Sequence, residues 1–301
     1  MRALSVLVIG AGVIGRIHAC RLVDAGHAVT VLARGDTAAE LASQGITLCE
    51  GSTRTSARVR VVEAVPEEFF DFILIAVRRD QSVAAIDVAV TVPAGVLVPM
   101  FNNPLGLGPL RERCGADRVI GAFPGVGGYI TPDGTVHYLQ IKQQPTTVEF
   151  CGGREDPLVQ ALVEAGFRVE RTDDMDAWLA THAVFVLALS AALARDDYSL
   201  QSLTADHIAM RTMVRAVRDG FHALEVRGIT ITPPALSTIF TRVPVAFAAY
   251  YWSRLLRGPL GQVAVLPHAR ATRDTEMAVL RTDIAELIPP GAAPRFDHLL
   301  S

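Results

Sequence analysis

The sequence predicts an α/β domain built on a parallel sheet, residues 1–171, followed by an all-helical domain, residues 172–301. In the first part, short apolar runs that suit buried strands alternate with segments of helical periodicity, the pattern of a parallel sheet covered by helices. After Met175 only helical periodicity remains. The length of 301 residues and the hydrophobic content of 50% supply apolar material for two cores.

A glycine motif follows the first predicted strand, Leu4–Ile9. Its G-x-G-x-x-G spacing suits a tight turn, a close approach of the backbone to a pyrophosphate, and close packing of the next helix. A predicted helix, 13–25, and a second buried strand, 28–32, complete a βαβ unit, so we predict a Rossmann-type dinucleotide site. The alternative is a fold of this type that no longer binds a dinucleotide. The residues expected at the dinucleotide are Gly10, Ala11, Gly12, Val13, Ile14 and Gly15. No secretory signal is expected, because the glycines and Arg16 interrupt the apolar run.

The end of the second strand selects the cofactor. Enzymes that use NAD usually carry Asp or Glu there to hold the ribose 2′-hydroxyl, whereas a nearby arginine accommodates the 2′-phosphate of NADP. This chain has Arg34 at that place, and Asp36 lies two residues further on. We therefore expect NADPH/NADP as the cofactor. The alternative is that Arg34 is only a solvated loop residue.

Two later segments also follow buried strands and are expected to face a ligand crevice. Arg78 and Gln81 come after the predicted strand 72–77, with the alternative that they cap a helix in solvent. Asn103 lies in the loop after the predicted strand 95–100, where the cofactor's nicotinamide would bind. The alternative for this Asn-Asn-Pro loop is a simple turn.

The remaining elements are predicted from alternation and helical periodicity. In the α/β part these are a helix over 37–44, strands over 46–49 and 57–62 joined by a turn over 51–56, a helix over 83–90, a strand over 118–123, a glycine-rich loop over 125–128, strands over 135–141 and 146–150 that pair as a hairpin or extend the sheet, a helix over 157–165 and a strand over 167–170. In the helical part they are 176–195, 205–226, 235–256 with an interruption at Pro244, 262–272 and 274–287.

Composition excludes several classes of function. The formal net charge of −3 gives no support for nucleic-acid binding. The most apolar later run, 183–194, is too short to span a bilayer and is expected to be a core helix, so no membrane partner is predicted. The four cysteines are scattered, without a C-x-x-C pair or a metal motif, and fit reduced thiols of a cytoplasmic protein. The apolar content of the helical part is compatible with a homodimer.

These motifs resemble those of the ketopantoate reductase family. The resemblance rests on VIGAGVIG at 8–15, on Arg34, on IAVRRDQ at 75–81, on FNNPLG at 101–106 and on Trp178. It implies a 6-phosphogluconate-dehydrogenase-like fold and NADPH-dependent reduction of 2-dehydropantoate in pantothenate biosynthesis. Two positions of the motifs depart from the family, which usually has lysine at Arg78 and glycine at Pro104.

The larger departure is in the helical part. By the resemblance, a lysine two residues after Trp178 and asparagines one and two turns later act on the substrate. Here these positions are Ala180, Val184 and Ala188, and the family's glutamate falls near Gln262. The three apolar residues share one helical face, because they are four residues apart. The sequence thus predicts a more apolar pocket and a bulkier, less polar carbonyl or imine substrate.

Other side chains have to supply the proton for such a reduction. His268 and Tyr250 lie in helices that close the family's substrate cleft, and with Asn103 they are our candidate catalytic residues. The alternative is that these rings fill a core or an interface, and His182 is expected to be a core histidine. We predict an NADPH-dependent oxidoreductase acting on a small-molecule carbonyl. The alternative is a protein that binds NADPH without hydride transfer, as a sensor, a structural ligand site or a non-redox enzyme.

Overall fold

The computed structural model describes residues 2–301, and the chain forms two compact units. The first contains the residues up to Phe101 together with 107–173, and the second contains 102–106 together with 174–301. The boundary between Asp173 and Asp174 lies two residues beyond the predicted one. The short segment 102–106 belongs to the helical unit, although the chain on both sides of it belongs to the α/β unit.

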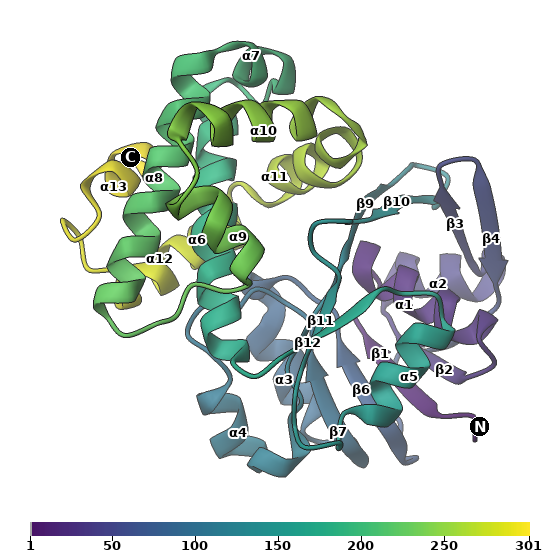
Figure 1. The fold of residues 1–301 in the computed structure, drawn as a ribbon. Helices are drawn as coiled ribbons and strands as arrows, with labels where there is room; N and C mark the ends of the chain where they lie inside the picture. The colour runs from purple at the N-terminus through teal and green to yellow at the C-terminus, as the bar shows by residue number, and fades with distance from the viewer. Residues whose placement is uncertain (1) are drawn as a thin grey trace. The chain divides into compact units, whose positions relative to one another are not determined.

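The α/β unit is built on a five-stranded parallel sheet, in the order β5-β2-β1-β6-β7. Its strands are β1 (Ser5–Ile9), β2 (Ala28–Leu32), β5 (Arg60–Val62), β6 (Phe70–Ile75) and β7 (Ala94–Pro99). Val8 is paired with Val31 on one side and with Leu74 on the other, so β1 is central. The strand order reverses there, which is where doubly wound sheets bind ligands. The predicted fold class, with this sheet and a helical second unit, is confirmed (Figure 1).

Two smaller sheets complete this unit, with orders β4-β3-β10-β9 and β12-β11-β8. Their strands are β3 (Ile46–Glu50), β4 (Thr53–Ala57), β8 (Ala122–Phe123), β9 (Val126–Ile130), β10 (Val136–Gln140), β11 (Thr146–Glu149) and β12 (Val169–Thr172). The expected loop at 125–128 is largely strand β9. A Cβ on Gly128 would lie 2.2 Å from the His137 carbonyl oxygen, so this glycine allows β10 to approach. The segments 135–141 and 146–150 do not pair with each other, because β10 and β11 belong to different sheets.

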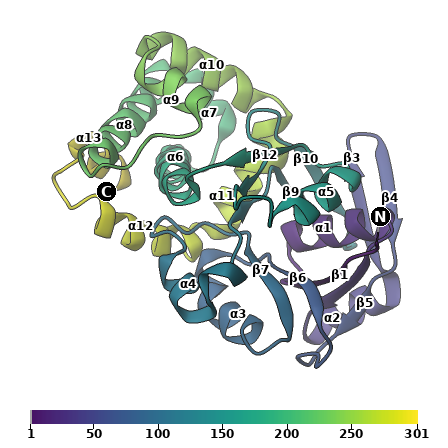
Figure 2. The ribbon, with the colours of Figure 1, turned by 60° about the horizontal axis from the view of Figure 1, so that its bottom comes forward.

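The helices of the α/β unit are α1 (Val13–Asp24), α2 (Gly35–Gln44), α3 (Ser82–Ala89), α4 (Gly108–Cys114) and α5 (Asp156–Glu164). Figure 2 shows α1 and α3 beside the parallel strands. Within the predicted turn 51–56, β4 already begins at Thr53 and forms a hairpin with β3. The predicted strand 57–62 is therefore divided between two sheets.

The helical unit is organised around α6 (Met175–Arg195), whose residues are buried on nearly all sides. The other helices are α7 (Leu200–Ala205), α8 (His207–Val226), α9 (Pro234–Thr241), α10 (Val245–Arg257), α11 (Leu266–Thr272), α12 (Glu276–Leu287) and α13 (Pro294–Leu300), with a π-helical turn at Leu260–Val265. Helix α6 is long and apolar enough to cross a membrane, with a mean hydropathy of 1.9, but 78% of its apolar window is buried within the protein. That burial is typical of a core helix.

Candidate functional site

The three glycines after β1 have different structural surroundings. Gly10 has φ +109°, and a Cβ there would lie 2.5 Å from the Ala76 carbonyl oxygen. A Cβ on Gly15 would lie 1.8 Å from the carbonyl oxygen of Gly10. A Cβ on Gly12 would meet no atom within 4 Å. The fold thus requires Gly10 and Gly15, whereas the absence of a side chain at Gly12 leaves space in front of the loop.

That space lies at the N-terminus of α1. Gly12 is the residue before the helix and has no capping side chain, and the first turn contains no acidic residue. The first N–H groups of the helix have no intrahelical acceptors, and together with the helix dipole they favour an anion. The predicted contact residues 10–15 therefore form a site that fits a pyrophosphate.

Arg34 is exposed and immediately precedes α2. Its neighbour Gly35 donates a backbone hydrogen bond to Glu63 Oε2 over 3.2 Å, so a carboxylate lies close to the arginine in the described structure. Arg78 forms hydrogen bonds from Nε and Nη2 to the Asp80 carboxylate over 3.2 and 3.3 Å. Gln81 precedes α3 and is exposed. These placements leave Arg34 accessible to a ligand, and they give Arg78 a local ion pair.

A second group of polar residues lies within the helical unit and links Asn102, His268 and Glu276. Asn102 Nδ2 donates a hydrogen bond to Glu276 Oε1 over 2.9 Å, and His268 Nε2 lies 3.6 Å from Glu276 Oε2. The Glu276 side chain is only 3% exposed, whereas that of His268 is 42% exposed. A buried carboxylate thus lies beneath a histidine that solvent can reach. We call these three residues the Asn-His-Glu group.

Asn102 and Glu276 were not among the residues selected from the sequence. Asn102 lies directly before the predicted Asn103, and Glu276 begins α12, 174 residues further along the chain. The Asn102 amide oxygen is buried and has no hydrogen-bond partner among residues 2–301. The only sequence signal at Glu276 was an acidic residue at a helix start, which is common because it complements the helix dipole.

The other predicted residues are placed differently. Asn103 Nδ2 donates to the Gly106 carbonyl oxygen over 2.5 Å, the contact of the turn that was the alternative for this loop. Tyr250 lies on α10 with 61% of its surface exposed. Within residues 2–301, no hydrogen bond or ring contact joins Tyr250 to the Asn-His-Glu group.

His182 is a core histidine in the structure. Its ring stacks on Trp178 with a centroid separation of 5.0 Å. Burial, and to a smaller extent the nearby His268, lowers the pKa of His182 to about 3. The ring is therefore neutral near pH 7, and it places an uncharged aromatic surface near the Asn-His-Glu group.

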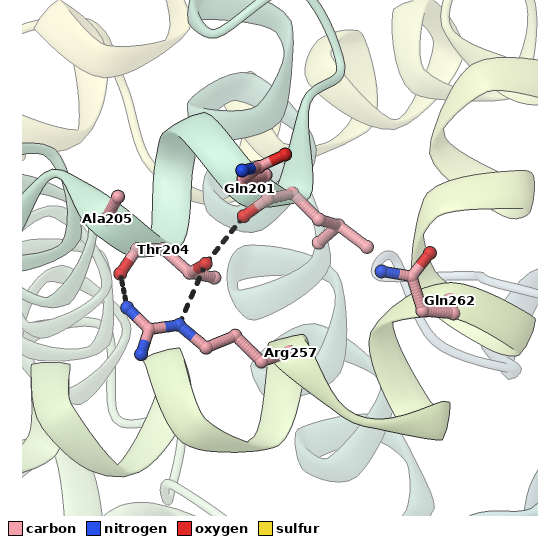
Figure 3. A pocket seen from close by; sticks show the side chains of 6 residues that line it. Gln201, Thr204, Ala205, Arg257 and Gln262 are labelled. Atoms are coloured by element: carbon pink, nitrogen blue, oxygen red, sulfur yellow. Dashed lines mark hydrogen bonds between the residues drawn. The ribbon is translucent and has the colours of Figure 1, made fainter.

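The structure corrects two expectations from the family resemblance. Ala180, Val184 and Ala188 are at most 1% exposed and belong to the hydrophobic core of the helical unit, so they do not form an open apolar pocket wall. Gln262 lies in the π-helical turn, on the wall of a pocket of about 240 Å³ that contains no residue of the Asn-His-Glu group (Figure 3). That pocket is lined by Leu200, Gln201, Thr204, Ala205, Arg257 and Gln262. The buried carboxylate near a predicted donor is that of Glu276.

The doubly wound sheet, the open glycine loop at its switch point and the helical second unit define a dinucleotide-binding protein of the two-unit reductase class. The family model described as Ketopantoate reductase PanE/ApbA matches residues 6–153. The α/β part of the chain thus matches the ketopantoate reductase family, as the sequence motifs predicted, and this match supports an NAD(P)-dependent oxidoreductase. A search among curated proteins found no match.

Solved structures of low sequence identity share the fold over nearly the whole chain. A 2-dehydropantoate 2-reductase from Geobacter metallireducens GS-15 aligns over 99% of both chains, with 16% identity and a TM-score of 0.76. A D-mandelate dehydrogenase, in a ternary structure with NADH and anilino(oxo)acetate, aligns over 99% of this chain and 97% of its own, with 13% identity and a TM-score of 0.75. A 2-dehydropantoate 2-reductase from Methylococcus capsulatus aligns over 94% and 96%, with 19% identity and a TM-score of 0.64.

Proposed function

We propose that this protein is an NADPH-dependent reductase of a small-molecule carbonyl compound, either a 2-oxo acid or a bulkier, less polar ketone or imine. The observation that carries the proposal is the open space in front of Gly12, at the N-terminus of α1 and at the switch point of the sheet. The backbone N–H groups of this loop would hold the pyrophosphate. When bound, the cofactor would supply the hydride.

Arg34 supports NADPH as the form of the cofactor. It is exposed and faces no bonded partner that would have to be displaced in residues 2–301. Its guanidinium would pair with a 2′-phosphate. Glu63 accepts a hydrogen bond from the neighbouring Gly35 N–H, and this bond holds its carboxylate. Arg78 is retained as a candidate contact with the cofactor.

The Asn-His-Glu group would supply the proton that the family's lysine delivers. Negative charge develops on the carbonyl oxygen as the carbon is reduced, so a donor is needed there. His268 is exposed enough to meet a substrate, and the Glu276 carboxylate lies 3.6 Å from its Nε2. Asn102 fixes that carboxylate through its Nδ2 group. Asn103 and Tyr250 remain further candidates.

The first experiment is a titration of the purified protein with NADPH and NADH, followed by absorbance assays with 2-dehydropantoate and a panel of bulkier 2-oxo acids, ketones and imines. We expect NADPH to bind more tightly than NADH, and Arg34→Ala to weaken NADPH binding at least tenfold while changing NADH binding less than threefold. Arg58→Ala, an exposed arginine beyond α2, is the matched control. Loss of both affinities to an equal extent would contradict the role of Arg34.

Turnover separates the two functions considered. Oxidation of NADPH that depends on a carbonyl substrate supports the reductase. Tight binding of NADPH without turnover of any compound in the panel favours a protein that binds the nucleotide without hydride transfer, a function consistent with alanine at the lysine position, Ala180. If the protein binds neither NADPH nor NADH, both of these functions are overturned.

A further inference from the structure

Arg16, in the first turns of α1, is buried to 4% exposure beneath the glycine loop. Its Nε donates to the Ala11 carbonyl oxygen over 2.9 Å. Its Nη1 and Nη2 donate to Glu40 Oε1 and Oε2 over 2.7 and 3.1 Å, which is a bidentate arginine–carboxylate pair. Nη1 also lies 3.3 Å from the Gly134 carbonyl oxygen. A buried guanidinium needs such partners, because an unpaired charge is costly away from water.

The bond to Ala11 fixes the peptide between Ala11 and Gly12. A trans peptide is planar, and its C=O and N–H groups point in opposite directions. With the Ala11 carbonyl oxygen held by Arg16, the Gly12 N–H points away from Arg16. Gly12 is also the residue with open space around its Cα. Arg16 thus determines how the loop presents a donor to an anion.

The bond to Glu40 connects this loop to α2, the helix that begins directly after Arg34. Glu40 lies in the second turn of α2, and its pKa is lowered, chiefly by the hydrogen bond from Arg16. The turn between β9 and β10 is adapted to the same pair, since a Cβ on Gly134 would lie 2.2 Å from Glu40 Oε1. The ion pair between Arg16, 4% exposed, and Glu40, 30% exposed, therefore links the glycine loop, the second turn of α2 and this turn.

We propose that Arg16 is a positioning residue for the dinucleotide, acting with Glu40 to hold the Ala11–Gly12 peptide in its anion-binding orientation. The inference rests on the proposed function, since it concerns how the same nucleotide would be held. Arg16 itself is covered by the loop and acts through Ala11 and Gly12. Arg16 would affect binding of the pyrophosphate of the cofactor, whereas Arg34 would affect binding of the 2′-phosphate.

The test is Arg16→Met, which keeps the length of the side chain and removes its donors. Affinities for NADPH, NADH and adenosine 2′-monophosphate are measured by fluorescence or calorimetric titration, together with the thermal midpoint. We expect NADPH and NADH to lose at least tenfold in affinity, by equal factors, and adenosine 2′-monophosphate, which has no 5′-phosphate, to lose less than threefold. Arg16→Lys, which restores one donor, should recover part of the loss.

The matched control is Arg21→Met on the same helix. Arg21 also donates to backbone, at Ala165 over 2.8 Å, but on a segment away from the glycine loop. We expect this variant to lower the thermal midpoint without changing any of the three affinities. If Arg16→Met does not fold, Glu40→Gln is used in its place. The Glu40→Gln variant removes the charge that compensates Arg16 and keeps the shape of the Glu40 side chain.

Equal losses for all three ligands, or unchanged affinity for NADPH and NADH in the folded Arg16 or Glu40 variant, would overturn the positioning role. Failure of the proposed function itself is seen separately, because the unaltered protein would then bind neither NADPH nor NADH. In that case the inference fails with it.

Discussion

Two histidine–glutamate pairs in the helical unit differ mainly in burial. His268 and Glu276 are 3.6 Å apart with the carboxylate 3% exposed, whereas His222 and Glu225 are 3.9 Å apart with the carboxylate 52% exposed. Water screens the exposed pair, so its interaction is weak. The carboxylate of Glu276 is shielded from water and held by Asn102, so its position beside His268 is fixed.

This contrast gives a prediction for single residues. With a carbonyl compound that supports turnover, His268→Asn should lower kcat by roughly 100-fold or more, the usual contribution of a general acid. Glu276→Gln should lower kcat roughly tenfold and leave the fold intact, since a glutamine oxygen still accepts the Asn102 bond. Steady-state kinetics at saturating NADPH measure both. His222→Asn and Glu225→Gln are the controls and should change kcat less than twofold; a similar loss in the controls would remove the assignment.

The loop that follows β7 shows what could be predicted at this scale. Its two adjacent amides and proline indicated a functional loop or a turn, and the structure divides the two roles between neighbours. Asn103 closes the turn to Gly106, whereas Asn102 bonds Glu276. Sequence reasoning selected Asn103 and missed Asn102, because neighbouring side chains point in different directions and the partner lies 174 residues away.

At the scale of elements, the loop between β1 and α1 contains two kinds of glycine. Gly10 and Gly15 are needed for folding, whereas Gly12 leaves room for a ligand. Gly12→Ala should keep the thermal midpoint within a few degrees, because its φ of −80° is allowed and its Cβ meets nothing. NADPH affinity should fall at least tenfold, since the methyl group would occupy the space of the pyrophosphate.

Gly15→Ala is the matched comparison. Its Cβ would overlap the Gly10 carbonyl oxygen at 1.8 Å, so the loop or α1 must move, at a cost of about 1–3 kcal/mol or more in the free energy of unfolding. Thermal unfolding without nucleotide and a fluorescence titration distinguish the two variants. Greater destabilisation by Gly12→Ala than by Gly15→Ala would contradict this division of roles.

Local patterns predicted the βαβ unit well, because strand, glycine turn and helix each leave a signature within a few residues. The two smaller sheets were predicted less well. Strand β9 contains Gly127 and Gly128 and looked like a loop, because the approach of β10 to Gly128 is not visible in the local sequence. The burial of Ala180, Val184 and Ala188 could not be predicted from local sequence either. It depends on the helices packed around α6, which the spacing of four residues does not specify.

At the scale of the whole molecule, each unit contains a buried histidine whose pKa is strongly lowered, His18 in the α/β unit and His182 in the helical unit. Burial lowers the pKa of His18 to about 4 and, with a contribution from His268, that of His182 to about 3. In an unfolded chain a histidine titrates near pH 6.5, so the unfolded chain takes up protons between pH 6.5 and 4 that the folded chain does not. The free energy of unfolding is therefore highest above pH 6.5 and falls as the pH is lowered through this window.

For His18 the loss should reach about 3 kcal/mol at pH 4 and roughly 2 kcal/mol at pH 5. Urea unfolding followed by circular dichroism at pH 7 and pH 5 measures it. His18→Leu should remove this part of the pH dependence, whereas His222→Leu, at an exposed position, should leave it unchanged. An undiminished pH dependence in His18→Leu would show that His18 is not the source. Trp178 and Trp252 both lie in the helical unit, so their fluorescence follows the unfolding of the unit that contains His182.

The assignment of residues 102–106 to the helical unit has a consequence for how this protein can change by recombination. A gene splice at residue 173 would join the α/β unit of one protein to the helical unit of another. Such a chimera would inherit Glu276 from one parent and Asn102 from the other, although the two form one buried hydrogen bond. The two units are therefore not interchangeable modules. A viable exchange has to carry the five-residue segment with the helices or find a parent that already has a matching amide.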